Sequence, residues 1–149
     1  MTAPAGIDVT AVTAWVHTRL PHLEPPLTFS RLAGGNSNLT YRCEDEKGHA
    51  CVLRRPPLGR VLATAHDMAR EHRIVSALAA SDVPVAPTHG LCENKAINGA
   101  PFYLMSFVAG VVLLDPEQAR ALPEAERDSL SEHVIGVLAN LHLTDIDSV

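Results

Sequence analysis

The sequence predicts an α+β domain: a five-stranded antiparallel sheet with one packed helix, flanked by an N-terminal and a C-terminal helix. Two observations favour this class. Five short apolar segments of strand length are bounded by Gly, Asn and Pro. Three longer segments repeat their apolar residues at helical spacing. At 149 residues the chain has room for one domain with a modest core.

The composition excludes several functional classes. Hydrophobic residues make up 46% of the chain and the mean hydropathy is +0.07, which is typical of a folded domain. The net charge of −5, without a basic cluster, argues against nucleic acid as a partner. The three cysteines have no metal-ligand spacing, so we expect free thiols in a reducing compartment. Because no leader-like or membrane-length apolar run is present, we expect a cytoplasmic protein without a membrane partner.

The first elements follow from proline and cap positions. Asp8 or Thr10 is a suitable N-cap for a helix that ends near Leu20, and prolines then stop it. We therefore assign residues 1–26 to an N-terminal tail and helix. Strands are expected at residues 27–33, 39–44 and 49–55, with a turn at residues 45–48.

A glycine-rich turn separates the first two strands. Glycine tolerates positive φ and has no Cβ, so a phosphate could approach this backbone closely, and the polar residues that follow add donors. The same residues also suit an ordinary hairpin, and this stretch alone leaves both readings open. The residues of the turn are Gly34, Gly35, Asn36, Ser37 and Asn38.

The third strand and the following helix each carry a charge on an apolar face. Alternation along the strand places Val52 and Arg54 on one side. In a helix over residues 63–80, Glu71 falls within an apolar stripe formed with Met68, Val75 and Leu78. A buried carboxylate needs a partner, and Arg54 is the obvious candidate. The alternatives are an arginine that reaches solvent from the strand end and a Glu71 solvated at the stripe's margin.

The rest of the chain predicts two more strands and a helix. Residues 85–93 form a strand whose Pro87 favours an edge position. Asn98-Gly99 predicts a hairpin turn into a strand at residues 101–108, which is nearly continuously apolar, as an interior strand would be. A loop then leads to a helix at residues 124–142, with an apolar face that includes Val134, Leu138 and Leu141.

This order, and five segments within it, resemble the aminoglycoside phosphotransferase family, and most closely its choline-kinase-like and acyl-CoA-dehydrogenase-associated branch. The segments are residues 32–41, 52–57, 70–72, 99–105 and 138–142. The resemblance implies a protein-kinase-like small lobe that binds nucleotide at residues 27–110. It also implies that residues 111–149 are the linker and first helix of a large lobe.

The resemblance implies specific roles for residues of the small lobe. The turn at residues 34–38 would cover the nucleotide, and Arg54 would steady its α- and β-phosphates, a task that suits a planar guanidinium. Glu71 would hold Arg54. Val52 and Met105 would line the adenine pocket, and the backbone of Ser106, Phe107 and Val108 would bind the base. Ser106 stands where the family favours an acidic residue.

The resemblance also implies what this sequence lacks. The family takes its base and its Mg²⁺ ligands from a downstream His-Gly-Asp segment and a later Asp, and neither is present here. We therefore expect an ATP-binding small lobe of a phosphotransferase for a small-molecule hydroxyl, with no catalytic or metal residue in this chain. The alternatives are a non-catalytic kinase-like binding or regulatory module and an inactive truncation. We also expect self-association through the C-terminal helix.

Overall fold

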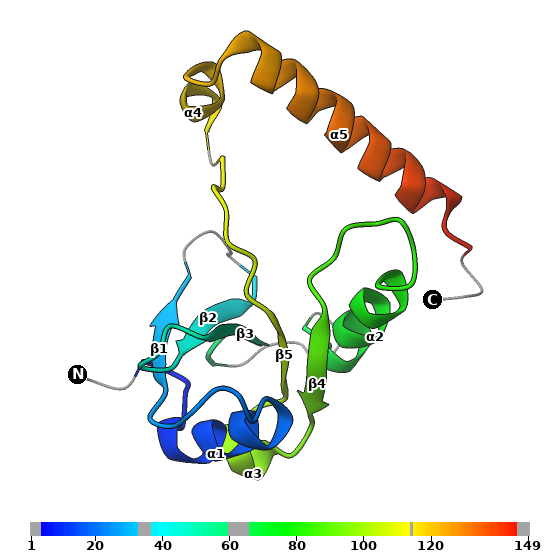
Figure 1. Ribbon diagram of the computed structural model, residues 1–149. Coiled ribbons are helices and arrows are strands. Elements are labelled where there is room, and N and C mark those ends of the chain that lie inside the picture. Colours follow the sequence, from blue (N-terminus) through cyan, green and yellow to red (C-terminus); the bar gives the residue numbers. More distant parts are fainter. Residues whose placement is uncertain (1–3, 33–36, 60–65, 114, 146–149) are drawn as a thin grey trace.

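The computed structural model describes residues 4–32, 37–59, 66–113 and 115–145, and it contains the expected α+β domain (Figure 1). In chain order, the elements are α1 (Val9–Arg19), β1 (Thr28–Arg31), β2 (Leu39–Glu44), β3 (Ala50–Arg55), α2 (Met68–Leu78), β4 (Thr88–Cys92), α3 (Lys95–Asn98), β5 (Phe102–Ser106), α4 (Pro116–Arg120) and α5 (Glu124–Leu143).

The five strands form one antiparallel sheet in the order β1-β2-β3-β5-β4. The first three strands are joined by short turns, whereas α2 carries the chain from β3 to the far edge. The predicted edge position of the fourth strand is therefore confirmed, and the fifth lies inside the sheet. Because β5 pairs with β3 across this crossover, residues far apart in sequence become neighbours on one face.

One face of the sheet carries the main core. Along β2, the alternate residues Leu39, Tyr41 and Cys43 are buried, as the two-residue period requires. The N-terminal segment and α1 cover them, with Val12 and Val16 fully buried. The ring of Trp15 meets that of Phe102 edge-on, with centroids 4.9 Å apart. Trp15 is thus a packing residue.

The opposite face is covered only in part. Helix α2 packs against β4 and β5, and its Met68 and Leu78 are buried. On the remaining strands, residues such as Thr40, Arg42 and Arg54 stay half-buried. These side chains of β2 and β3 are therefore partly accessible on this face.

The predicted hairpin turn at Asn98-Gly99 is wrong. Residues 95–98 instead form the one-turn helix α3, which Asn94 caps by accepting a hydrogen bond from the Ala96 amide. Gly99 ends it with φ of 70°, a left-handed conformation that favours glycine at a helix C-terminus. The same dipeptide that suits a hairpin thus serves here as a helix stop. β4 and β5 are still antiparallel neighbours.

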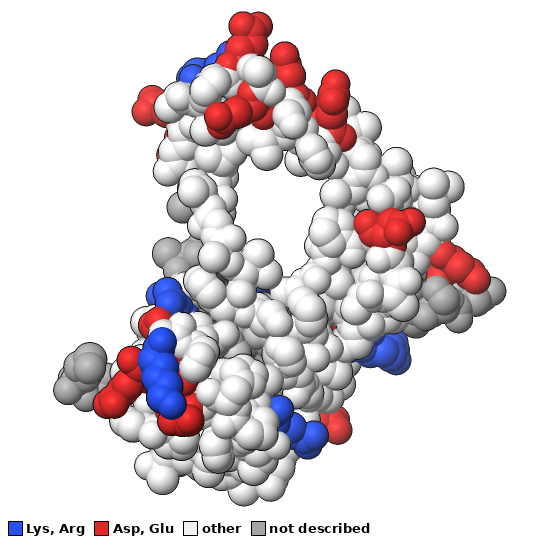
Figure 2. Space-filling model, viewed as in Figure 1, with Lys and Arg blue, Asp and Glu red and all other residues white. Residues whose placement is uncertain are grey.

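The C-terminal helices stand apart from the sheet. An extended segment after β5 leads to α4, which lies in the predicted loop, and then to α5, as expected from the sequence. Figure 2 shows an opening between α5 and the sheet domain, with acidic side chains gathered over α4 and the first half of α5. Asn140 of α5 donates a hydrogen bond to the Asp82 carbonyl oxygen across 3.2 Å. The apolar side chains of α5 are exposed, Val134 by 67% and Leu138 by 50%.

Candidate functional site

The candidate site lies on the accessible face of the sheet, where the strand register aligns residues in two rows. Antiparallel pairing sets Thr40, Arg54 and Tyr103 opposite one another across β2, β3 and β5. The neighbouring row contains Arg42, Val52 and Met105 in the same way. Opposed residues in an antiparallel sheet share a face. The register therefore brings Met105 next to Val52 and Arg54, which strand alternation already places on one face.

The predicted ion pair between Arg54 and Glu71 is present, with Arg54 Nε in contact with Glu71 Oε1. Glu71 reaches the sheet from the first turn of α2. The side chains are 30% and 28% exposed, so the pair is neither solvated nor buried. Arg54 Nη1 also donates to Thr40 Oγ1 at 3.3 Å. Arg54 is thus held in place while part of its guanidinium stays accessible on the face of the sheet.

Two further side chains complete the surroundings of Glu71. The Tyr103 hydroxyl donates to Glu71 Oε1 at 2.8 Å, and the Asn38 amide Nδ2 donates to Glu71 Oε2 at 2.9 Å. Burial, together with the hydrogen bond to Glu71, raises the pKa of Tyr103 well above its usual value. Tyr103 therefore stays protonated and acts only as a donor here. The sequence analysis missed Tyr103, although it stands two residues before Met105 on the same strand face.

The glycine-rich turn is described only at its end. Gly34, Gly35 and Asn36 lie outside the described residues. Ser37 is exposed, whereas Asn38 is only 7% exposed. The sequence analysis expected Asn38 to add a donor at the tip of the turn. Its side chain instead lies between Glu71 and His66, whose Nδ1 is 2.7 Å from Asn38 Oδ1.

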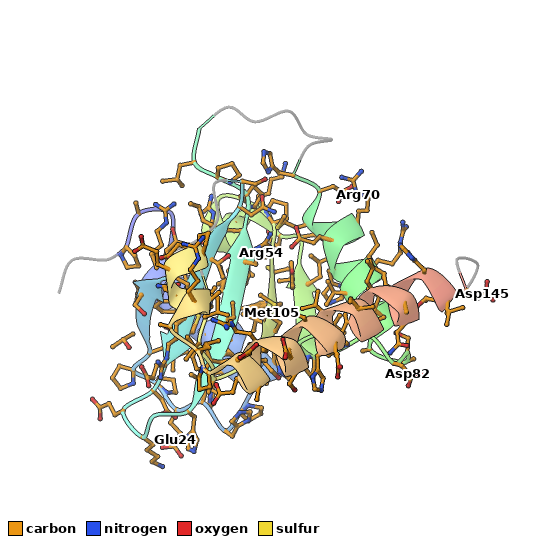
Figure 3. All side chains as sticks on the ribbon, turned by 90° about the horizontal axis from the view of Figure 1, so that it is seen from above. Glu24, Arg54, Arg70, Asp82, Met105 and Asp145 are labelled. Carbon is orange, nitrogen blue, oxygen red and sulfur yellow. The ribbon has the colours of Figure 1, made fainter. Side chains whose placement is uncertain are left out.

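The end of β5 holds the other predicted residues, and Figure 3 places Met105 near Arg54. The Ser106 amide donates to the Pro87 carbonyl oxygen at 2.8 Å, and its hydroxyl lies 2.8 Å from His89 Nε2. Burial, together with the charge of His22, lowers the pKa of His89. Val108 is 69% exposed. The Phe107 ring lies against the Arg42 guanidinium, 4.5 Å from its carbon, which is a cation–π contact that the sequence analysis missed.

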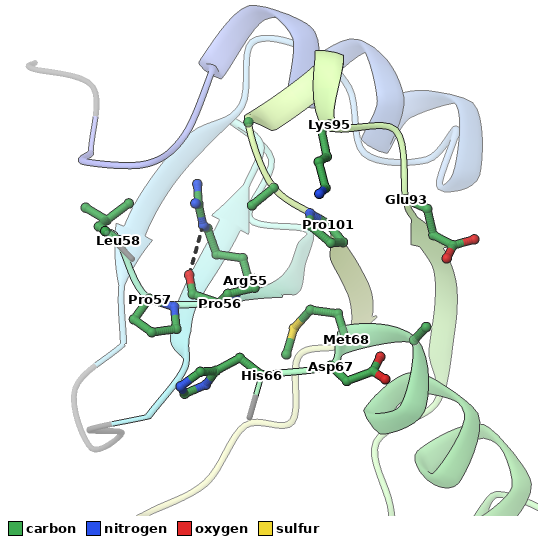
Figure 4. Close-up of a pocket in the computed structure, with 14 residues that line it drawn as sticks. Arg55, Pro56, Pro57, Leu58, His66, Asp67, Met68, Glu93, Lys95 and Pro101 are labelled. Carbon is green, nitrogen blue, oxygen red and sulfur yellow. Dashed lines mark hydrogen bonds between the residues drawn. The ribbon is translucent and has the colours of Figure 1, made fainter. Parts of the chain in front are cut away.

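A separate cavity of about 610 Å³ lies behind this site, between the end of β3, the start of α2 and α3 (Figure 4). Arg55, which faces away from Arg54, lies in its wall. Arg55 donates to the carbonyl oxygens of Gly6, Pro56 and Asn98, and burial lowers its pKa. The wall mixes Lys95 with Glu93 and Asp67, so the cavity has no single charge preference. The paired arginine and glutamate, in contrast, lie on the accessible face.

The residues around Arg54 place a cation beside apolar side chains. Arg54 offers an accessible guanidinium on a partly apolar face, a combination that suits phosphate beside a flat base. Over the described residues, no group of three or more His, Cys, Asp or Glu side chains is placed to bind a metal. In the same part of the chain, no helix is both long and apolar enough to cross a membrane.

The fold and the ion pair define a protein-kinase-like small lobe: a five-stranded antiparallel sheet whose helix presents a carboxylate to a cation on the third strand. The sequence profile of the phosphotransferase enzyme family matches residues 28–149. The chain belongs to this family, and the resemblance stated from the sequence is confirmed.

Known proteins show the same relationship. A Ralstonia eutropha crystal structure that carries a provisional assignment as an aminoglycoside phosphotransferase superposes with a TM-score of 0.74 and 32% identity. That match covers 95% of this chain and 40% of the other. Mouse acyl-CoA dehydrogenase family member 10 is 36% identical over 129 residues, or 85% of this chain and 12% of its own length. Human acyl-CoA dehydrogenase family member 11 is 32% identical over 127 residues, or 85% of this chain and 16% of its own length.

The chain corresponds to only part of each of these proteins. The chain spans 12% and 16% of these two curated relatives and 40% of the solved structure. The solved structure shares 95% of this chain, a stretch that includes the sheet and its packed helix. What a whole protein of this kind does is therefore taken up as a proposal.

Proposed function

We propose that this chain supplies the ATP-binding lobe of a phosphotransferase that transfers the γ-phosphate to a hydroxyl of a small molecule. The observation that carries the proposal is the Arg54–Glu71 pair on the accessible face. A cation fixed by a carboxylate, yet partly exposed, is suited to hold phosphate oxygens. Phosphoryl transfer depends mainly on such positioning and on charge stabilisation.

Each residue has a proposed task. Arg54 would bind the α- and β-phosphates, and Glu71 would keep its guanidinium oriented. Val52 and Met105, adjacent in the register, would line the base, and the backbone of residues 106–108 would hydrogen-bond it. Of residues 34–38, Asn38 contacts Glu71 and His66, and the other four would cover the phosphates. When bound, ATP would supply the transferable phosphoryl group, and Mg²⁺ would be held by its phosphates together with carboxylates of a large lobe.

The proposal assigns residues 27–110 to nucleotide binding and residues 111–149 to the connection with a large lobe. The acceptor would bind outside the residues discussed above. Cys43, Cys51 and Cys92 are all free and buried, which supports a reducing compartment such as the cytoplasm.

The test is titration of the chain with ATP, followed by NMR. Because only one lobe contacts the nucleotide, we expect a Kd on the order of 1 mM, or about 4 kcal/mol of binding free energy. Arg54→Ala should weaken binding at least about tenfold, by loss of a charge-assisted contact. Arg73→Ala, on the exposed side of α2, is the matched control and should bind as the wild type does. Equal affinities for the two variants would overturn the assignment of Arg54.

A further inference from the structure

The Asn38 side chain connects the start of β2 to α2 and to the residues just before α2. Asn38 is the last residue of the glycine-rich turn and directly precedes β2, and its side chain is buried. Its Nδ2 donates to Glu71 Oε2 at 2.9 Å, and its Oδ1 lies 2.7 Å from His66 Nδ1. His66 comes from the chain just before α2, so the turn, the entry to α2 and the helix itself meet at one amide.

The donor and the acceptor of each hydrogen bond between Glu71, Asn38 and His66 can be assigned in only one consistent way. Ionised Glu71 can only accept, so the NH₂ group of Asn38 must face it. The carbonyl oxygen of Asn38 therefore faces His66, and an oxygen can only accept. His66 must then carry a proton on Nδ1. The tautomer of His66 follows from the charge of a residue that it does not touch.

The Glu71 carboxylate ends this series of hydrogen bonds. Among the described residues, every side chain that contacts it is a hydrogen-bond donor. Arg54 and Tyr103 meet Oε1, and Asn38 alone among the described residues meets Oε2. Without Asn38, Oε2 would lose the one donor that the described part of the chain gives it, and Glu71 could rotate away from the sheet. The orientation of Arg54 would change with it, because Arg54 Nε is in contact with the same carboxylate.

We propose that Asn38 and His66 are positioning residues that orient Glu71, and through it Arg54, for nucleotide binding. The inference rests on the proposed function, because it assigns the residues that prepare the same site. Asn38 is then not a phosphate ligand, although it belongs to the glycine-rich turn. Its amide ties the start of β2 to α2 and so couples this end of β2 to the Arg54–Glu71 pair.

Matched substitutions at His66 test the donor role. His66→Gln keeps an N–H that can donate to Asn38, whereas His66→Phe keeps a planar ring without a donor. We expect the phenylalanine variant to bind ATP about tenfold more weakly, and the glutamine variant to stay within about threefold of wild type. The same pair of substitutions at exposed His133 on α5 is the control and should leave affinity unchanged. Thermal unfolding of each variant establishes that it is folded.

Asn38→Asp is a second, nearly isosteric test. It replaces the donor that faces Glu71 with an acceptor of like charge, so binding should weaken by at least about tenfold. ¹⁵N NMR of the wild-type imidazole should show Nδ1 as the protonated nitrogen of His66. An Nε2-protonated neutral ring, equal affinities for His66→Gln and His66→Phe, or full ATP affinity in Asn38→Asp would each overturn the inference.

These outcomes separate the inference from the proposed function. If wild-type chain shows no ATP binding, the proposed function fails, and positioning for nucleotide fails with it. The hydrogen-bond chain itself is still decided by the ¹⁵N spectrum. If ATP binds and Arg54→Ala abolishes binding while the Asn38 and His66 variants bind normally, the proposed function stands and the inference is wrong.

Discussion

Glu71→Gln is the most informative single perturbation of this domain. Among the described residues, three side chains meet the carboxylate, those of Arg54, Tyr103 and Asn38, and each presents a donor to it. A glutamine amide keeps only one accepting oxygen, so its NH₂ group must face another donor. One hydrogen bond is lost and the ion pair disappears, while volume and shape are nearly unchanged.

The solvent exposure of Arg54 and Glu71 determines how much Glu71→Gln should change the free energy of unfolding. Exposed ion pairs contribute about 0–1 kcal/mol, whereas removal of one partner from a buried pair costs about 3–5 kcal/mol. With side chains 30% and 28% exposed, Arg54 and Glu71 lie between these limits. We expect Glu71→Gln to lower the free energy of unfolding by about 1–2 kcal/mol.

A double-mutant cycle with Arg54→Met isolates the pair. Urea unfolding can be followed by the fluorescence of Trp15, the only tryptophan, whose ring packs on Phe102 in the core of the opposite face. We expect a coupling energy of about 1 kcal/mol between the two substitutions. A coupling below about 0.3 kcal/mol, with unchanged ATP affinity in Glu71→Gln, would refute the reasoning. Such a result would mean that Glu71 is solvated and does not stabilise Arg54.

Four further outcomes are expected. Burial opposes the charge of Asp45, but hydrogen bonds from His49 and from backbone amides outweigh it and hold the pKa at about 2. Since this pKa is depressed, ionised Asp45 stabilises the fold above about pH 4. That contribution is lost as the pH falls toward 2, so urea unfolding between pH 2 and 5 should show a slope that Asp45→Asn reduces. A hydrogen bond with Cys51, together with burial, raises the pKa of Cys43. A thiol reagent at neutral pH should therefore label Cys43 only when the chain unfolds. Rapid labelling of the native chain would contradict this. The exposed apolar face of α5 should drive self-association, and Leu138→Glu should shift sedimentation toward monomer; a wild-type monomer at high concentration would contradict the expectation. A polypeptide of these 149 residues should show no phosphoryl transfer from Mg-ATP to aminoglycosides, choline or hydroxyacyl compounds, and product above the level of an Arg54→Ala control would overturn this.

The sequence by itself was sufficient for features that depend on periodicity. Strand alternation placed Val52 and Arg54 on one face, and the helical period placed Glu71 in an apolar stripe. A charge on an apolar face needs a partner, so the pairing of Arg54 with Glu71 followed without coordinates. The short helix α4 also had a sequence signal, since Asp115 caps it and Pro116 opens it, but the loop assignment overlooked this signal.

Only the tertiary structure decided which residues surround that pair. Tyr103 reaches Glu71 because β5 inserts between β3 and β4 after a crossover, a strand order that no local pattern encodes. Asn38 and His66 lie in irregular segments, where side-chain direction has no period to follow. The sequence thus suggests Asn38 as a donor at the tip of a turn, whereas in the fold its side chain donates to Glu71 of α2. Periodic segments specify their own faces, but contacts between segments require the whole fold.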